Sequence, residues 1–334
     1  MNHNGDICTA TVEDDDDDYE EIENFQLWST FKGRSMSRPH GVKVGPTGDI
    51  LVADRNNGLV KVFTLHGRYV NKITVSEDPI DMAVLEEDVI AISDHKKKTV
   101  LVCTKGSQVL REIGMGLLVA PLGIASKHKL LYVADSGDSN IKVFTFSGEH
   151  VRTIGSVGKG QGELLVPWFI AINKKDQVIV ADALNNAVKV YTLEGEFLFQ
   201  FGKFGTREGQ LINPRGVAVD KKNNIFVTSN HMIQMFDQKG EFLSRVDLPK
   251  DGMKSPHGIV VATYEPIEIA VADTGNNCIK VYAKEDEQDR LQEDEVDSLP
   301  SLAQMEPRRN STIASLPLDF HHKPLLKRRS SVFF

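Results

Sequence analysis

The chain contains 334 residues, of which 40% are hydrophobic and 26% are charged, and its formal net charge is −8. It has enough apolar residues for a large buried core, but no apolar run long enough to span a membrane. The N-terminus has no signal-peptide pattern, and three scattered cysteines give no disulfide framework. These features argue against a membrane protein, and we expect a cytoplasmic one.

The first element in chain order is an acidic arm. Residues 1–33 contain ten acidic residues against one lysine, and five of the acidic residues are consecutive aspartates at 14–18. We expect residues 1–23 to be a solvated, disordered tail, because such a charge run cannot bury a core. The alternative is an arm that competes with an acidic partner for basic loops.

Six copies of one short phrase follow. Each copy reads apolar–apolar–Ala–Asp, then a polar turn, then Ile/Val–Lys–Val–Phe/Tyr. The four clearest copies span residues 51–63, 132–144, 179–191 and 270–282. Two copies are weaker: one keeps Asp94 but has lysines in its turn, and the other has Ser229 in place of the aspartate. A repeat of this size determines the architecture.

Each unit opens on a proline, and successive prolines lie 40 to 47 residues apart. This period matches the roughly 40–50 residues of a propeller blade, and the richness in Val, Ile, Phe and Tyr favours strands over helices. In the unit that opens on Pro167, the pattern predicts strands over 169–172, 177–181, 188–193 and 196–201. The fold class predicted is all-β: a six-bladed β-propeller with four antiparallel strands per blade.

The sixth unit ends after Tyr282 without a fourth strand. Residues 24–33 resemble the fourth strand of the unit that opens on Pro167. We therefore expect an N-terminal strand over Phe25–Phe31 to close the last blade, which removes an exposed blade edge. The predicted domains are an acidic tail over 1–23, a propeller over 24–283 and a mostly disordered tail over 284–334.

The phrase resembles the NHL repeat, which is named for Asn-His-Leu in the turn after the recurring aspartate. The residues at this position are Asn57-Gly58-Leu59, Lys97-Lys98-Thr99, Asp138-Ser139-Asn140, Asn185-Asn186-Ala187, Asn230-His231-Met232 and Asn276-Asn277-Cys278. The resemblance covers residues 34–283 and implies a non-enzymatic propeller that binds protein or RNA, often behind a RING and B-box region. The three cysteines of this chain cannot build a RING zinc site.

The resemblance implies a protein-binding propeller, as an adaptor or substrate-recognition module in ubiquitination or signalling. One alternative is an RNA-binding propeller, and another is a metal-dependent lyase or hydrolase. For the enzyme alternative, the recurring aspartates would be a carboxylate ring, but one copy in almost every unit favours turn caps. The recurring aspartates are Asp54, Asp94, Asp135, Asp182 and Asp273.

His40 and His257 share a Pro-His-Gly phrase in the first and last units, which become neighbours when the ring closes. The equivalent residues elsewhere complete no metal set, so we predict no cofactor and no metal. These residues are Ile80, Leu122, Trp168 and Arg215.

Loops on one face of the propeller carry the residues we predict to bind a partner. They are Arg38, His40, Arg55, Lys96, Lys97, Lys98, Trp168, Arg215, Lys254 and His257. Residues 34–283 contain 30 basic against 27 acidic residues, which is weak for nucleic acid. We therefore expect a protein partner before RNA, and neither DNA nor a membrane.

Two Arg-Arg-x-Ser sequences in the C-terminal tail resemble sites of basophilic kinases, and they make Ser311 and Ser331 candidates for phosphorylation.

Overall fold

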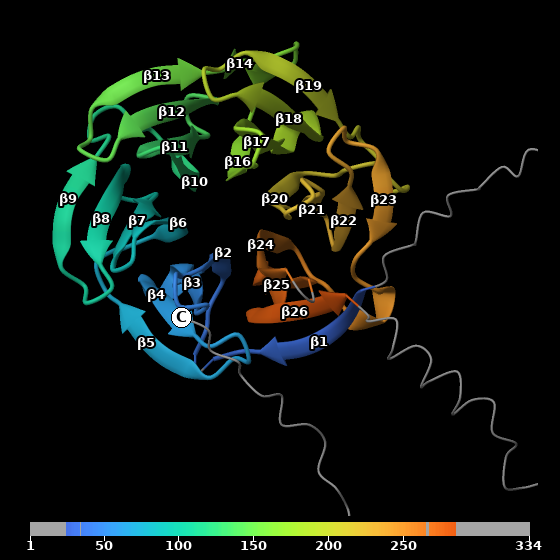
Figure 1. The fold of residues 1–334 in the computed structure, drawn as a ribbon, viewed down its shortest axis with the longest axis horizontal. Helices are drawn as coiled ribbons and strands as arrows, with labels where there is room; N and C mark the ends of the chain where they lie inside the picture. The colour runs from blue at the N-terminus through green and yellow to red at the C-terminus, as the bar shows by residue number, and fades with distance from the viewer. Residues whose placement is uncertain (1–24, 34, 265–266, 285–334) are drawn as a thin grey trace, which may run out of the picture. The chain divides into compact units, whose positions relative to one another are not determined.

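The computed structural model describes residues 25–33, 35–264 and 267–284, and these residues form a six-bladed β-propeller (Figure 1). Six four-stranded antiparallel sheets surround a central channel, and the first strand of each repeat is the innermost. The structure confirms the fold class predicted from the repeat.

The strand bounds follow the repeat closely. Blade 1 contains β2 (Pro39–Val44), β3 (Ile50–Asp54), β4 (Leu59–Phe63) and β5 (Tyr69–Ile73). Blade 2 contains β6 (Pro79–Glu86), β7 (Val89–Asp94), β8 (Thr99–Thr104) and β9 (Val109–Ile113). Blade 3 contains β10 (Pro121–Lys127), β11 (Leu130–Asp135), β12 (Asn140–Thr145) and β13 (His150–Ile154).

The second half of the ring has the same order. Blade 4 contains β16 (Pro167–Ile172), β17 (Gln177–Asp182), β18 (Ala187–Thr192) and β19 (Phe197–Phe201). Blade 5 contains β20 (Pro214–Val219), β21 (Ile225–Ser229), β22 (Met232–Phe236) and β23 (Phe242–Arg245). Blade 6 contains β24 (Pro256–Tyr264), β25 (Ile267–Asp273), β26 (Cys278–Lys284) and β1 (Phe25–Phe31).

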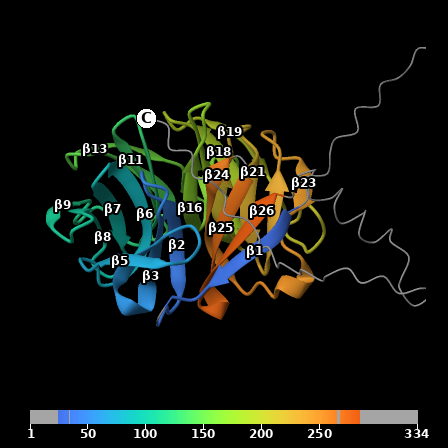
Figure 2. The same ribbon diagram turned by 60° about the horizontal axis from the view of Figure 1, so that its bottom comes forward.

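The two ends of the ring differ in their connections. One end, called the loop face below, carries the loops between blades and the loops from the second to the third strand of each blade. It includes the short pair β14 (Ser156–Val157) and β15 (Glu163–Leu164) and the 3-10 turns η1 (Arg55–Asn57), η2 (Ala183–Asn185), η3 (Pro249–Asp251) and η4 (Thr274–Asn276). The helical turns along the lower edge of Figure 2 mark this face. The other end, the turn face, carries the tight turns within blades.

The N-terminal strand closes the ring, as the sequence predicts. β1 pairs antiparallel with β26, with Phe25 opposite Lys284 and Phe31 opposite Ile279. The Phe25 ring is buried and meets Phe226 of blade 5 edge-on at 6.0 Å between centroids. The last blade thus contains strands from both ends of the propeller, and β1 covers the edge that β26 would otherwise expose.

The core consists of six hydrophobic clusters, each between two neighbouring blades. In β3, Leu51 and Ala53 belong to the cluster shared with blade 2, whereas Ile50 and Val52 belong to the cluster shared with blade 6. Successive side chains of a strand point to opposite faces, and here both faces are buried. This burial explains the unbroken apolar runs before each recurring aspartate.

The repeated phrase encodes a buried ion pair within the blade. The recurring aspartates are all fully buried, and in four blades the carboxylate pairs with the lysine of the same phrase. The N–O distances are 2.7 Å for Lys61–Asp54, 2.6 Å for Lys142–Asp135, 3.4 Å for Lys189–Asp182 and 2.8 Å for Lys280–Asp273. The sequence analysis assigned the aspartates to turns and missed this pairing.

The same carboxylates fasten the loop that enters the blade. Asp182 accepts the backbone N–H groups of Leu165 and Val166, just before the opening proline, at 3.0 and 3.2 Å. Lys189 Nζ donates to the carbonyls of Gly160 and Glu163 in the same loop. The pair therefore fixes the loop before the blade, as well as the turn that the sequence analysis expected it to cap.

The two weaker copies avoid an unpaired buried lysine. In blade 5, Ser229 and Gln234 replace the pair with neutral groups, and Ser229 Oγ accepts the Ile212 N–H at 2.8 Å. In blade 2, Leu101 replaces the lysine, and Asp94 accepts hydrogen bonds from the backbone of Glu77 and Lys97. A buried lysine without a carboxylate is costly, which explains why no blade keeps the lysine alone. Asp94 is kept without a lysine because the Ser76 hydroxyl and two backbone N–H groups donate to its carboxylate.

The start of each first strand is irregular. In all six blades the register shifts within the three residues after the opening proline. In blades 5 and 6 a glycine lets the next strand approach closely: a Cβ at Gly216 would lie 2.1 Å from the carbonyl oxygen of His257, and one at Gly258 would lie 2.6 Å from that of His40. The residue between proline and glycine is therefore held at the channel.

Deletion of residues 1–33 removes β1 and should lower the melting temperature by at least about 10 °C, because the burial of Phe25 and Phe31 is lost. Deletion of residues 1–24 is the control, since every contact of β1 is kept. Thermal unfolding followed by circular dichroism measures both, and equal melting curves would contradict the closure.

The Lys189→Gln variant should lose about 3–5 kcal/mol of unfolding free energy, because the Asp182 carboxylate is left unpaired. The double variant Asp182→Ser/Lys189→Gln copies the neutral pair of blade 5 and should recover part of that loss. Denaturant unfolding of both single variants and the double variant gives the coupling energy. Losses that simply add would show that the pair does not act as a unit.

Candidate binding site at the channel mouth

The second residue of each innermost strand lines the channel at the loop face. These residues come from β2, β6, β10, β16, β20 and β24, and they are His40, Ile80, Leu122, Trp168, Arg215 and His257. We call this end of the channel the mouth. The position is the same in every blade, but the side chains differ, so the mouth breaks the symmetry of the ring.

Two histidines and a tryptophan form the centre of the mouth. The His40 and His257 rings are 0% and 2% exposed, and their centroids are 4.3 Å apart in an edge-on contact. The Trp168 indole stacks on His257 at 5.2 Å and lies 6.1 Å from His40, although it comes from blade 4 on the opposite side of the ring. The two histidines are neighbours, as ring closure predicts, and both rings are buried.

Arg215 lies against both aromatic groups. Its guanidinium carbon is 5.1 Å from the centre of the Trp168 ring, a cation–π contact. Its Nη1 donates to Nε2 of His257 and to the hydroxyl of Ser255. Because a guanidinium cannot accept, Nε2 of His257 must be unprotonated, and the ring hydrogen is on Nδ1.

The imidazoles are neutral at physiological pH. Burial lowers the pKa of His40 to about 2, and the charges of Arg55, Arg38 and Arg215 add to this effect. Burial, followed by His40 and Arg215, lowers the pKa of His257 well below its usual value. Burial and the nearby charge of Arg38 also lower the pKa of Arg215. The centre of the mouth is thus aromatic and neutral, and arginines surround it.

The predicted site residues fall into two groups. Arg38, His40, Arg55, Trp168, Arg215 and His257 gather at the mouth, through direct contacts or charges strong enough to shift a neighbour's pKa. Lys96, Lys97, Lys98 and Lys254 are exposed on the same face, and within the part of the chain that the structure describes none of them forms a hydrogen bond or ion pair with a residue of the mouth. Lys96 pairs with Glu77 at 2.6 Å, and the Lys254 N–H bonds to Asp273 at 2.9 Å.

The residues predicted to bind a partner do not include the large apolar side chains that the loop face exposes. They are Met115, Leu117, Val119, Val157, Leu184, Phe204 and Leu248, with exposed fractions between 43% and 71%. Most lie in the loops between blades, and longer spacing between prolines was the signal for the loops around blade 4. In the described part of the chain, the exposed large apolar side chains nearest to the other face are Tyr69 and Val109, at 51% and 45%, which begin outer strands directly after two of its turns.

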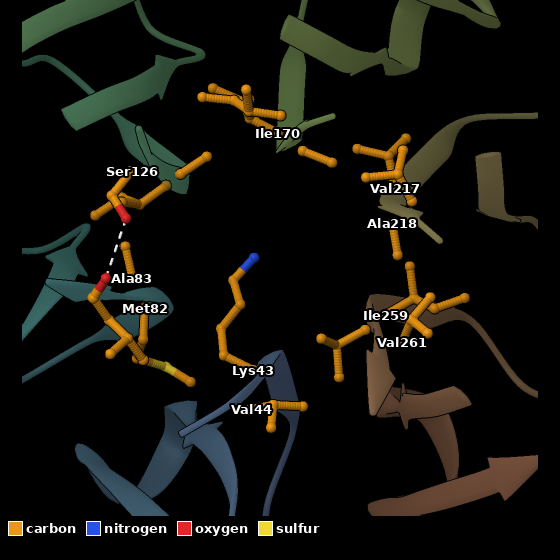
Figure 3. Close-up of a pocket in the computed structure, with 17 residues that line it drawn as sticks. Lys43, Val44, Met82, Ala83, Ser126, Ile170, Val217, Ala218, Ile259 and Val261 are labelled. Atoms are coloured by element: carbon orange, nitrogen blue, oxygen red, sulfur yellow. Dashed lines mark hydrogen bonds between the residues drawn. The ribbon is translucent and has the colours of Figure 1, made fainter. Parts of the chain in front are cut away.

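Beyond the mouth, the channel widens into a cavity of about 350 Å³ toward the turn face. Figure 3 shows apolar side chains of the six inner strands around it, with the Lys43 amine projecting into the centre. Lys43 Nζ lies 3.3 Å from the buried carboxylate of Asp81. Burial raises the pKa of Asp81, and the charge of Lys43 opposes this shift.

Other classes of site are not visible in the described residues. Within residues 25–33, 35–264 and 267–284, no group of three or more His, Cys, Asp or Glu side chains could hold a metal ion. None of the helices in those ranges is long and apolar enough to cross a membrane. The acidic arm, Ser311 and Ser331 lie outside the described residues.

Comparison with protein families gives two matches. The NHL repeat matches residues 36–63, which cover most of blade 1 through β4. A family described as a 6-bladed beta-propeller matches residues 117–202, which cover blades 3 and 4. No curated protein matches the sequence.

Solved structures with the same fold have low sequence identity. A virginiamycin B lyase from Staphylococcus aureus is 17% identical, with a TM-score of 0.55 over 78% of this chain and 88% of that one. A gluconolactonase from Xanthomonas campestris is 11% identical, with a TM-score of 0.60 over 75% and 86%. A chain of a nidogen/laminin complex is 18% identical, with a TM-score of 0.55 over 71% and 86%.

These similarities establish the fold alone, because enzymes and binding proteins both occur among the similar structures. The repeat phrase, the six four-stranded sheets and the two family matches agree with one another. The chain is a six-bladed β-propeller, and its first blade matches the NHL repeat.

Proposed function

We propose that this propeller binds a protein partner through its loop face and performs no catalysis. The observation that carries the proposal is the unequal distribution of exposed apolar side chains between the two ends of the ring. Met115 and Phe204 are 70% and 71% exposed in loops of that face. Exposed apolar groups that gather on one face of a protein mark an interaction surface.

The composition of the mouth supports a protein partner. Arginine and tryptophan dominate the binding energy of protein interfaces when they lie near the centre and are surrounded by contacts that exclude water. Arg215 and Trp168 occupy such a position, and the apolar loops with Lys96 and Lys254 form the surrounding rim. A propeller of the same fold forms part of the nidogen/laminin complex.

RNA binding is less well supported by the same residues. Carboxylates already neutralise part of the basic charge on this face: Arg55 forms a bidentate pair with Asp78 at 2.6 and 3.0 Å, and Lys96 pairs with Glu77. RNA-binding surfaces use unpaired cations to neutralise phosphates. The NHL resemblance then favours an adaptor or substrate-recognition role in ubiquitination or signalling for the protein-binding propeller.

The double variant Met115→Glu/Phe204→Glu should reduce the amount of captured partner by about tenfold, since charges on exposed apolar side chains oppose burial in an interface. Affinity capture from a lysate of the source cells measures it, with quantitative mass spectrometry. Val70→Glu is the matched control, because Val70 is 50% exposed on the outer strand of blade 1. Equal capture by both variants would contradict an interface on the loop face.

A further inference from the structure

The mouth of the channel holds two positive charges without counter-charges. Among the described residues, Arg55 is neutralised by Asp78. Lys43, which lies below the mouth, is neutralised by Asp81. Arg215, which contacts Trp168, and Arg38, which lies two residues before His40, form no ion pair with a described carboxylate. The charge of Arg38 lowers the pKa values of His40, His257 and Arg215. Two like charges that share a partly desolvated site repel each other unless an anion lies between them.

The groups beneath these arginines cannot supply the missing charge. Arg215 is held by neutral His257, so its positive charge is not cancelled as a carboxylate partner would cancel it. Nδ1 of His257, both ring nitrogens of His40 and Nε of Arg215 are buried without a hydrogen-bond partner among the described residues. The site therefore has more donors than acceptors, which is the composition of an anion site.

The backbone of Arg38 adds an independent observation. Arg38 lies directly before Pro39 with φ +52°, in the left-handed region that a branched or long side chain rarely adopts. The equivalent residues in blades 5 and 6, Asn213 and Ser255, have φ +50° and +51°. Asparagine is well suited to this conformation, whereas arginine is not. The backbone conformation thus recurs in three blades, and only blade 1 has a charged side chain at this position.

We propose that the mouth binds an oxyanion, a carboxylate or a phosphate, presented by a side chain or terminus of the protein partner. Arg38 and Arg215 are the charged donors, and Trp168 is the surface that covers the bound group. His257 is a positioning residue that holds Arg215 without neutralising it, and His40 packs against His257. This inference rests on the proposed function and names the chemistry that the partner presents at the centre of the interface.

A peptide fits this site better than RNA. Apart from Trp168, the apolar members of the mouth ring are the aliphatic residues Ile80 and Leu122, which offer no surface for stacking successive bases. Two arginines around one narrow channel end match a single anionic group. The repeated phosphates of a nucleic acid would require a basic groove instead.

The chain provides its own reporter for the test. It contains two tryptophans, and Trp28 lies 55% exposed on β1, away from the mouth. In a Trp28→Phe background of the full chain, fluorescence therefore reports on Trp168 alone. The probes are inorganic phosphate, acetate, and one peptide in three forms, with serine, phosphoserine or glutamate at a central position. Binding that reaches saturation for the charged forms, and is absent for the serine form, supports the inference.

Arg38→Asn is the decisive variant. It should weaken binding of the anionic probes at least about tenfold, because a charged hydrogen bond is lost. Its melting temperature should be unchanged or higher, because asparagine suits the left-handed backbone at this position. Arg215→Gln should weaken binding to a similar or greater extent. Arg68→Gln, which removes an exposed arginine on the turn face, is the charge-matched control.

Any of four results would overturn the inference. The first is anion binding that is the same in Arg38→Asn, Arg215→Gln and Arg68→Gln. The second is the absence of saturable binding by every probe. The third is a single-stranded RNA that binds through Arg38 and Arg215 more tightly than either charged peptide. The fourth is partner capture that Met115→Glu/Phe204→Glu loses and Arg38→Asn keeps. This result would contradict the anion site and would still support the proposed interface.

Discussion

The buried pair of aspartate and lysine in the repeated phrase is the interaction on which the rest of the structure depends. Taking two charges out of water is costly, so the pair is stable only when its remaining hydrogen-bonding groups are satisfied. The backbone groups that satisfy it belong to the loop entering the same blade, as the bonds of Asp182 and Lys189 to residues 160–166 show. The pair therefore couples the strands of a blade to the loop before it.

This coupling connects the ring to the mouth. Each loop ends at the opening proline, and the next residue is the one that lines the mouth. Because the proline and the bulge after it are fixed, the mouth residue is positioned by the blade and remains free to vary in chemistry. The copies build six equivalent positions, and the residues His40, Trp168, Arg215 and His257 convert them into an asymmetric site.

Much of the fold could be predicted from the sequence. The proline spacing gave the number of blades, and the likeness between residues 24–33 and an outer strand predicted the closure by β1. Both signals are local and repeated, so tertiary packing does not change them. The proximity of His40 and His257 also followed, because ring closure makes the first and last blades neighbours.

Other features depend on information that the sequence does not contain. Lys189 lies seven residues after Asp182, and in a strand that is buried on both faces no alternation marks it as an internal partner. Arg38, Trp168 and Arg215 come from different blades, so predicting that they meet requires knowing the width of the channel. Charge counts could not distinguish the two arginines from Lys96, Lys97 and Lys98. Proline spacing indicates longer loops around blade 4, but the exposure of Met115 and Phe204 comes from the folded structure.

The central claim is that the ion pairs hold the loops and thereby preform the mouth. Native-state hydrogen exchange of the Lys189→Gln variant tests it most directly. The account requires faster exchange at the amides of Leu165 and Val166, which bond to Asp182, and unchanged exchange at Val119 and Ala120, which bond to Asp135. Unchanged protection at Leu165 and Val166, or an equal loss in both loops, would contradict it.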